Sequence, residues 1–322
     1  MGQIILKKYN NVANYFADTG CVLTNHHITM ADLCRYAISI GGLSYYTVSP
    51  IGTRFYQSLV EMALVEGTGF TIGDDYKYSE KSIKNSISFF MGMIAAKAVS
   101  DKVYHVPYLF HLNDEQISYT TAGGCPDFFG LENGANPILM EAKGTTGSRP
   151  KHSAIIKADT QLNDVNRIVV DGWPTVYTTF KKSIVVSCFE NDQLVYHDID
   201  PNQKGDVSLV IKDIDMAIWV YYGNIIKMIS ANSVDSTTLE GLKYVTFHAN
   251  QHYIGLREDI YEVLRYYQEA CYKDMQVREE YPFKGLYKQI DEIVKDISVE
   301  KQSESDKISL GRDGIICFSE TV

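Results

Sequence analysis

One apolar run constrains this chain more than any other feature. Ile138 to Met140 are followed directly by Glu141-Ala142-Lys143. A short unbroken apolar run is typical of a buried strand, which has no reason to end in an acid and a base unless a site lies there. Side chains alternate between the faces of a strand. Glu141 and Lys143 are therefore expected to point the same way, with Ala142 turned into the core.

A second acid, Asp127, follows Pro126 and begins another expected strand, over Asp127 to Leu131. Residues 132–136 are turn-like, because Asn and Gly tolerate left-handed backbone angles. The two strands then form a hairpin that brings Asp127 beside Glu141 and Lys143. Two carboxylates suit a hard cation such as Mg²⁺, which can activate a water and stabilise charge on a phosphoryl oxygen. A lysine can orient or deprotonate that water and offset negative charge.

The rest of the chain divides into three predicted regions. Residues 1–77 are expected to be helical, residues 78–200 to form a mixed α/β core, and residues 201–322 to be mainly helical with a mobile polar tail segment at 301–307. Within the core, the patterns predict a helix from Ser79, a strand within 102–112, a helix over 152–168 and strands over 175–180 and 183–189. The helices are predicted from the spacing of apolar residues, and the strands from their high content of Val, Ile, Tyr and Thr.

That order of elements, together with Pro126-Asp127 and Glu141-Ala142-Lys143, resembles the PD-(D/E)xK nuclease superfamily over about a third of the chain, residues 79–189. The resemblance implies an α/β, restriction-endonuclease-like core with a mixed central sheet flanked by helices, and helical additions at both ends. It implies Asp127 and Glu141 as metal ligands, the Ala142 carbonyl as a further ligand, and Lys143 as the catalytic lysine, with Mg²⁺ or Mn²⁺ as cofactor.

The resemblance also implies a polar residue on the helix after the hairpin. Lys157 and Gln161 are four residues apart, hence on one helical face, and fit that role. Arg149 and Lys151 in the preceding loop are weaker candidates for binding substrate. Members of the superfamily often add an acid from an earlier helix, and three acids are open for this role: Glu61, Glu66 and Glu80.

The function that the resemblance implies is hydrolysis of nucleic-acid phosphodiester bonds by a metal-dependent endonuclease. DNA is the favoured substrate, and RNA stays open. Restriction or antiviral defence is the expected context, with a homodimer or a separate helicase or sensor protein as partner, because the chain has no Walker motif. The alternative is a catalytically silent module of the same fold that binds nucleic acid or protein.

Charge and composition narrow these possibilities. The chain carries a formal net charge of −10, yet residues 143–182 hold seven basic residues against three acids, a local charge of +4 that favours phosphate binding. No apolar run approaches the roughly 20 residues of a membrane span. The six cysteines form no CxxC pair and no signal peptide is readable, so reduced thiols and a cytoplasmic location are expected.

Overall fold

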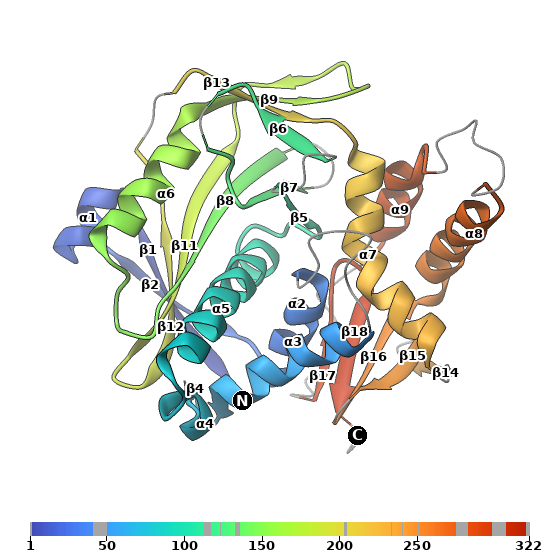
Figure 1. The fold of residues 1–322 in the computed structure, drawn as a ribbon, viewed down its shortest axis with the longest axis horizontal. Coiled ribbons are helices and arrows are strands. Elements are labelled where there is room, and N and C mark those ends of the chain that lie inside the picture. Colours follow the sequence, from blue (N-terminus) through green and yellow to red (C-terminus); the bar gives the residue numbers. More distant parts are fainter. Residues whose placement is uncertain are drawn as a thin grey trace.

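The computed structural model describes residues 2–40, 50–112, 117–122, 124–132, 136–202, 205–232, 234–239, 241–249, 251–274, 283–297 and 307–319. This part of the chain is mixed α/β, with three sheets and helices that cover them (Figure 1). The helices are α1 (Val12–Ala17), α2 (Met30–Ile40), α3 (Pro50–Ala63), α4 (Asp74–Lys77), α5 (Lys81–Lys102), α6 (His152–Asp164), α7 (Ile214–Ala231), α8 (Glu258–Asp274) and α9 (Leu286–Lys295).

The nine-stranded central sheet has the order β2-β1-β12-β11-β8-β7-β5, with β4 beside β12 and β3 beside β4. Its strands are β1 (Gln3–Tyr9), β2 (Val22–His27), β3 (Leu64–Glu66), β4 (Phe70–Ile72), β5 (Leu109–His111), β7 (Phe128–Glu132), β8 (Asn136–Gly144), β11 (Lys181–Glu190) and β12 (Gln193–Ile199). Strands β5, β7 and β8 form an antiparallel meander, and β11 lies parallel to β8. Helix α5 precedes this meander, and α6 connects β8 to β11.

Two smaller sheets complete the described fold. Four strands form the second sheet, in the order β10-β9-β13-β6. They are β6 (Ser118–Thr120), β9 (Val165–Val170), β10 (Val176–Tyr177) and β13 (Val207–Ile211). Five strands form the third, in the order β14-β15-β16-β18-β17. They are β14 (Asp235–Leu239), β15 (Leu242–Ala249), β16 (His252–Arg257), β17 (Ile308–Leu310) and β18 (Ile315–Ser319).

Side-chain alternation along β8 sorts two hydrophobic cores onto the two faces of the central sheet. Ile138, Met140 and Ala142 pack in one cluster with the apolar face of α5, and Leu139 packs in the other with α6. In Figure 1, β8 and β11 run between these two helices. Glu141 has the same parity as Leu139, so it lies on the α6 face.

Helix α5 approaches β8 closely at two glycines. A Cβ on Gly92 would lie 2.7 Å from the carbonyl carbon of Lys143, and a Cβ on Gly144 would overlap the carbonyl oxygen of Ser88. Glycine at both positions therefore allows the helix to lie directly against the strand that ends in Glu141-Ala142-Lys143.

The prediction of a helical region over residues 1–77 is wrong for its first part. Residues 3–27 contribute strands β1 and β2, and β1 lies parallel to β12 in the central sheet. Alternating Ile4 and Leu6 bury one face of β1, although two lysines follow them. The partner of β1 lies about 190 residues further along the chain, so no local pattern shows this pairing. Helices α2 and α3 agree with the predicted helical segments.

The C-terminal region is also less helical than predicted. Helices α7, α8 and α9 are present, but the same region also contributes the five strands of the third sheet. Strands β16 and β18 pair although α8 and α9 lie between them in the sequence. No local pattern therefore predicts the third sheet. Residues 301–306, expected as a mobile tail segment, lie outside the described residues. The described helices include none with the length and apolar character needed to cross a bilayer.

Smaller differences concern element ends. The helix expected over 152–168 stops at Asp164, where β-branched residues begin strand β9. Helix α5 extends to Lys102 and takes up the start of the strand expected within 102–112. Its N-cap is Glu80 rather than Ser79, and the Glu80 carboxylate accepts a hydrogen bond from the backbone N–H of Ser82.

Candidate metal centre

The structure brings the three central predicted residues together at one edge of the hairpin. Strands β7 and β8 pair in a register in which Phe128 faces Met140. The next step of that register places Asp127 opposite Glu141. Parity along the strands puts Asp127, Glu141 and Lys143 on the same face, the face covered by α6.

Asp127 and Glu141 are held by reciprocal hydrogen bonds with the backbone of the neighbouring strand. The backbone N–H of Asp127 donates to Glu141 Oε2 at 3.0 Å, and the N–H of Ala142 donates to Asp127 Oδ2 at 2.9 Å. Each carboxylate is thereby fixed in orientation by a rigid sheet rather than by a loop. A metal site requires ligands that are already held in a fixed orientation before the ion binds.

The ammonium group of Lys143 lies among the predicted ligand oxygens. Its Nζ is 2.5 Å from Glu141 Oε1, 3.2 Å from the Ala142 carbonyl oxygen and 4.0 Å from Asp127 Oδ2. Three oxygens from two strands therefore converge on one positive charge. The arrangement shows that this corner of the sheet accommodates a cation.

The cluster is open to solvent on one side only. The side chain of Glu141 is 2% exposed, whereas those of Asp127 and Lys143 are 27% and 21% exposed. Burial raises the pKa of Glu141 to about 7, and the nearby Asp127 carboxylate adds to this rise. Lys143 opposes the rise but does not cancel it. A carboxyl group with such a pKa in a partly open cluster is typical of functional sites.

Helix α6 supplies the predicted polar residue beside this cluster. Gln161 donates a hydrogen bond of 3.0 Å from Nε2 to the carbonyl oxygen of Cys125, two residues before Asp127. The amide thus fixes the backbone that leads into the hairpin. Lys157, one helical turn earlier, is exposed on the surface of α6.

The other candidates take different places. Arg149 forms an ion pair of 2.5 Å with Asp18 and donates to the backbone carbonyl of Tyr15, so α1 holds it. Lys151 is the exposed N-cap residue of α6. Two of the three candidate acids are engaged elsewhere. Glu80 caps α5, and Glu61 lies 3.5 Å from His252 in the third sheet.

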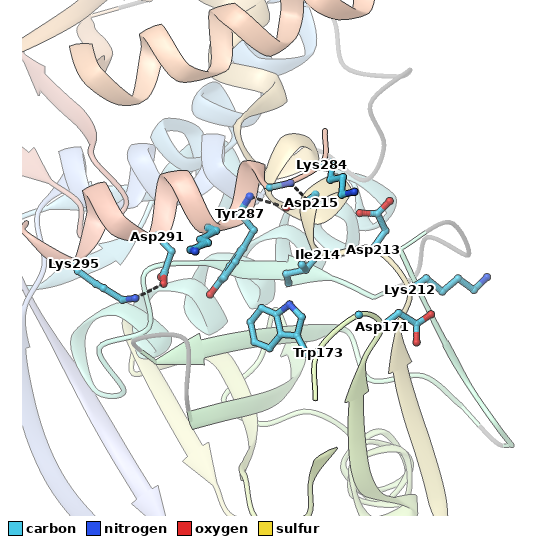
Figure 2. Close-up of a pocket in the computed structure, with 13 residues that line it drawn as sticks. Asp171, Trp173, Lys212, Asp213, Ile214, Asp215, Lys284, Tyr287, Asp291 and Lys295 are labelled. Atoms are coloured by element: carbon cyan, nitrogen blue, oxygen red, sulfur yellow. Dashed lines mark hydrogen bonds and ion pairs between the residues drawn. The ribbon is translucent and has the colours of Figure 1, made fainter. Parts of the chain in front are cut away.

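A cavity of about 630 Å³ lies elsewhere in the molecule and does not include any of these residues (Figure 2). It lies between Trp173, the first turn of α7 and one side of α9. Lysines and aspartates line it in equal numbers, and the aspartates have structural roles. Asp215, for example, accepts hydrogen bonds from the backbone N–H groups of Gly285 and Tyr287 and so caps α9. The cavity shows no excess charge that would select a phosphate.

Sequence reasoning overlooked two buried clusters that each combine a cysteine, a glutamate and a histidine. One contains Cys34, Glu61 and His252, and the other contains Cys188, Glu190 and His197. The second cluster has a local signal. Cys188 and Glu190 share one face of a strand, and a tight turn at residues 191–192 returns the chain toward His197.

Comparison with protein-family models, with curated proteins and with solved structures gives no match to this chain.

Proposed function

We propose that this protein is a metal-dependent nuclease that hydrolyses DNA phosphodiester bonds. One observation carries the proposal, namely the convergence of the Asp127 and Glu141 carboxylates and the Ala142 carbonyl on the ammonium of Lys143. These are the groups that the resemblance to PD-(D/E)xK nucleases assigns to the metal and to the catalytic lysine. Asp127 lies 14 residues before Glu141 in the sequence, and Lys143 lies 2 residues after it. The convergence of these groups therefore depends on the register of the hairpin.

The order of elements around the cluster supports the same proposal. Helix α5, the meander β5-β7-β8, the connecting helix α6 and the parallel strand β11 occur in the order expected for a restriction-endonuclease-like core, with β6 inserted between β5 and β7 and with β9 and β10 inserted between α6 and β11. The two helices cover opposite faces of the sheet. We propose that residues 79–189 correspond to this core, and that β1, β2 and β12 extend its sheet.

The residues present fit a divalent cation such as Mg²⁺ or Mn²⁺, since hard oxygen donors dominate the cluster. Asp127, Glu141 and the Ala142 carbonyl would hold the ion, which supplies an acidified water and a counter-charge for the phosphate. Lys143 would supply an ammonium group beside the ion, where it could orient the attacking water and balance charge on the phosphate oxygens. Gln161 keeps the Asp127 backbone in place through Cys125.

Substrate class and context are further parts of the proposal. The excess of basic residues between positions 143 and 182 supports an anionic polymer as substrate, despite the acidic average of the chain. Exposed Lys157 is the basic residue of α6 best placed to contact a phosphate near Gln161. A role in restriction or antiviral defence, alone, as a homodimer or with a helicase or sensor protein, rests on the resemblance.

Plasmid cleavage with titrated Mg²⁺ tests the proposal. Wild-type protein should nick plasmid DNA, and chelation with EDTA should stop it. Asp127→Asn, Glu141→Gln and Lys143→Ala should each lower the rate by roughly 100-fold or more, because the first two weaken the metal site and the third removes positive charge beside the phosphate. An RNA of matching sequence, assayed in parallel, identifies the preferred substrate.

Lys243→Ala is the matched control for Lys143→Ala, since Lys243 is an exposed lysine in the third sheet. It should keep wild-type activity. Equal cleavage by wild type and the three site variants would show that a contaminant cuts the DNA, and the enzyme proposal would fail. Tight DNA binding by wild type without any cleavage would instead favour the catalytically silent binding module.

A further inference from the structure

A second cluster lies on the central sheet beside the candidate nuclease centre. Cys188 and Glu190 belong to β11, and His197 belongs to the adjacent strand β12. Their ligand atoms all lie within 4.8 Å of one another. Cys188 and His197 are fully buried, whereas the side chain of Glu190 is 25% exposed. The cluster is therefore reached from the side of Glu190.

The three side chains converge on a single ring nitrogen. His197 Nε2 lies 3.0 Å from Glu190 Oε1 and 3.6 Å from Cys188 Sγ, whereas its buried Nδ1 has no hydrogen-bond partner among the described residues. In a cysteine–histidine–acid catalytic triad, the thiol and the acid contact opposite nitrogens of the ring. This arrangement does not fit such a triad, but it does fit ligands that share one ion.

The separations match those around a tetrahedral zinc ion. Bonds of roughly 2.3 Å to sulfur and 2.0–2.1 Å to nitrogen and oxygen place the sulfur about 3.6 Å, and the oxygen about 3.4 Å, from the nitrogen. The distances in the structure are 3.6 Å and 3.0 Å. A shift of a few tenths of an ångström in Glu190 would bring the nitrogen–oxygen separation to the tetrahedral value. Lys7 binds the other oxygen of this carboxylate at 2.6 Å and leaves Oε1 available.

The charge states of the three groups suit metal binding at neutral pH. Burial lowers the pKa of His197 below its usual value, so its ring is neutral. The hydrogen bond from His197 and the ion pair with Lys7 hold the pKa of Glu190 at about 2. Burial raises the pKa of the Cys188 thiol to about 12, so this group alone must release a proton when it binds a metal.

The other Cys/Glu/His cluster provides a contrast. There, Gln57 Nε2 lies 2.9 Å from His252 Nδ1. An amide nitrogen can only donate, so it occupies the lone pair that a metal would need. His197 Nε2 instead donates its own proton to the Glu190 carboxylate, so this nitrogen presents a lone pair to a metal once the proton moves to Nδ1. The cluster of Cys34, Glu61 and His252 therefore serves as a matched control.

This cluster is too far from Lys143 to form part of the candidate nuclease centre. Lys143 pairs with Val186, and Val186 pairs with His197, across three adjacent strands. Two strand spacings correspond to about 10 Å. Paired catalytic ions lie only about 3.5–4 Å apart, so the two sites cannot share a two-metal centre.

We propose that Cys188, Glu190 and His197 bind one Zn²⁺ ion, with the fourth position open to water on the exposed side of Glu190. Cysteine, histidine and carboxylate together form a ligand set that zinc accepts and that Mg²⁺ does not. Binding converts the Cys188 thiol into a zinc thiolate and releases one proton to solvent. His197 keeps a single proton, which moves from Nε2 to Nδ1. The ion would tie β11 to β12 at the end of the sheet that α1 covers.

Metal titration of the chelator-treated full-length protein tests this inference. Zn²⁺ should bind at one ion per chain with release of about one proton, and Co²⁺ should give the near-ultraviolet band of a thiolate–cobalt bond. Cys188→Ser should abolish that band. His197→Gln and Glu190→Gln should each weaken Zn²⁺ binding by about 100-fold or more, beyond the effect of losing a supporting hydrogen bond.

Cys34→Ser and Glu141→Gln should both keep the cobalt band, so failure of the nuclease proposal leaves this test unaffected. Absence of stoichiometric Zn²⁺ binding by wild type, or a band that persists in Cys188→Ser, would overturn the zinc site. So would a band lost in Cys34→Ser. Should Cys188→Ser fail to fold, the proton release of wild type and the Zn²⁺ affinity of His197→Gln still decide the question.

Discussion

Glu141 sits in surroundings that disfavour its own charge. It is almost fully buried and faces another carboxylate, Asp127, and these two causes bring its pKa to about 7. Lys143 partly compensates, but a single ammonium cannot neutralise two acids. Function at this position is therefore expected to conflict with stability, because the two acids suit a divalent cation better than the single positive charge of Lys143.

Replacement of Glu141 by Gln should stabilise the protein at alkaline pH. A carboxyl group whose pKa rises from 4.5 to about 7 on folding contributes full stability below pH 4.5 and loses it as pH rises to 7 and above. The loss corresponds to about 3 kcal/mol. Urea unfolding at pH 8.5 should therefore show Glu141→Gln to be more stable than wild type by up to this amount, with little difference at pH 4.5. Glu292→Gln, an exposed change on α9, should show no such pH dependence.

Proton and metal should also compete for Glu141. With a pKa of about 7, the apparent affinity for Mg²⁺ should fall about tenfold from pH 8 to pH 6, because the protonated carboxyl group must first lose its proton. Isothermal titration calorimetry with Mg²⁺ at pH 6, 7 and 8 measures this. An affinity that does not change over this range would contradict competition between proton and metal at Glu141.

At the scale of elements, the position of β8 depends on its contact with α5. Gly92 and Gly144 allow the backbone of the helix and that of the strand to touch, directly beside Lys143. The end of β8 that carries Glu141 therefore packs against α5 on one face of the sheet. On the opposite face, where the cluster lies, α6 and Gln161 support it.

Gly144→Ala should force α5 away from β8. Its Cβ would overlap the carbonyl oxygen of Ser88, and overpacking of this kind costs about 2–3 kcal/mol. Differential scanning calorimetry should show a clear fall in Tm, accompanied by loss of nuclease activity because Lys143 moves with the strand. Gly147→Ala is the matched control three residues away, where a Cβ would meet no atom within 4 Å. Equal Tm values for the two variants would contradict the close packing.

At the scale of the whole molecule, a buried network of charges joins the third sheet to the central core. Arg35 on α2 lies 2.8 Å from Asp101 on α5 and 3.5 Å from Asp313 in the turn between β17 and β18. Its Nε also donates to Ser309 at 2.8 Å. Burial by itself would raise the pKa of Asp101, but Arg35 and Lys97 instead lower it to about 2. Charges so far from solvent must remain paired.

Arg35→Ala should therefore loosen the C-terminal sheet. Removing one partner of a buried ion pair costs about 3–5 kcal/mol, because the remaining charges lose their compensation. Hydrogen exchange measured by mass spectrometry should show residues 307–319 losing protection before the central sheet does. Arg265→Ala, which breaks exposed pairs with Glu262 and Glu269 on α8, should leave the free energy of unfolding close to that of wild type. Similar losses in the two variants would argue against the role of Arg35.

Most of the core pattern was predictable from the sequence because its signals are local. The apolar run before Glu141 predicted strand β8, and apolar spacing predicted helix α5. The placement of Asp127 opposite Glu141 followed from two strands joined by a short turn. Residues within such a hairpin are close in sequence, so strand alternation suffices to predict which of them meet.

The tertiary structure alone decided the features that depend on distant segments. The parallel pairing of β1 with β12 turned the first residues into part of the central sheet, and the pairing of β16 with β18 built the third. Tertiary contacts likewise set the convergence of Lys143 on three oxygens and the pKa of Glu141. Local sequence determines which faces are apolar and which side chains lie in line. The partners of those faces, and the burial of each charge, are fixed only when segments far apart in the chain exclude water together.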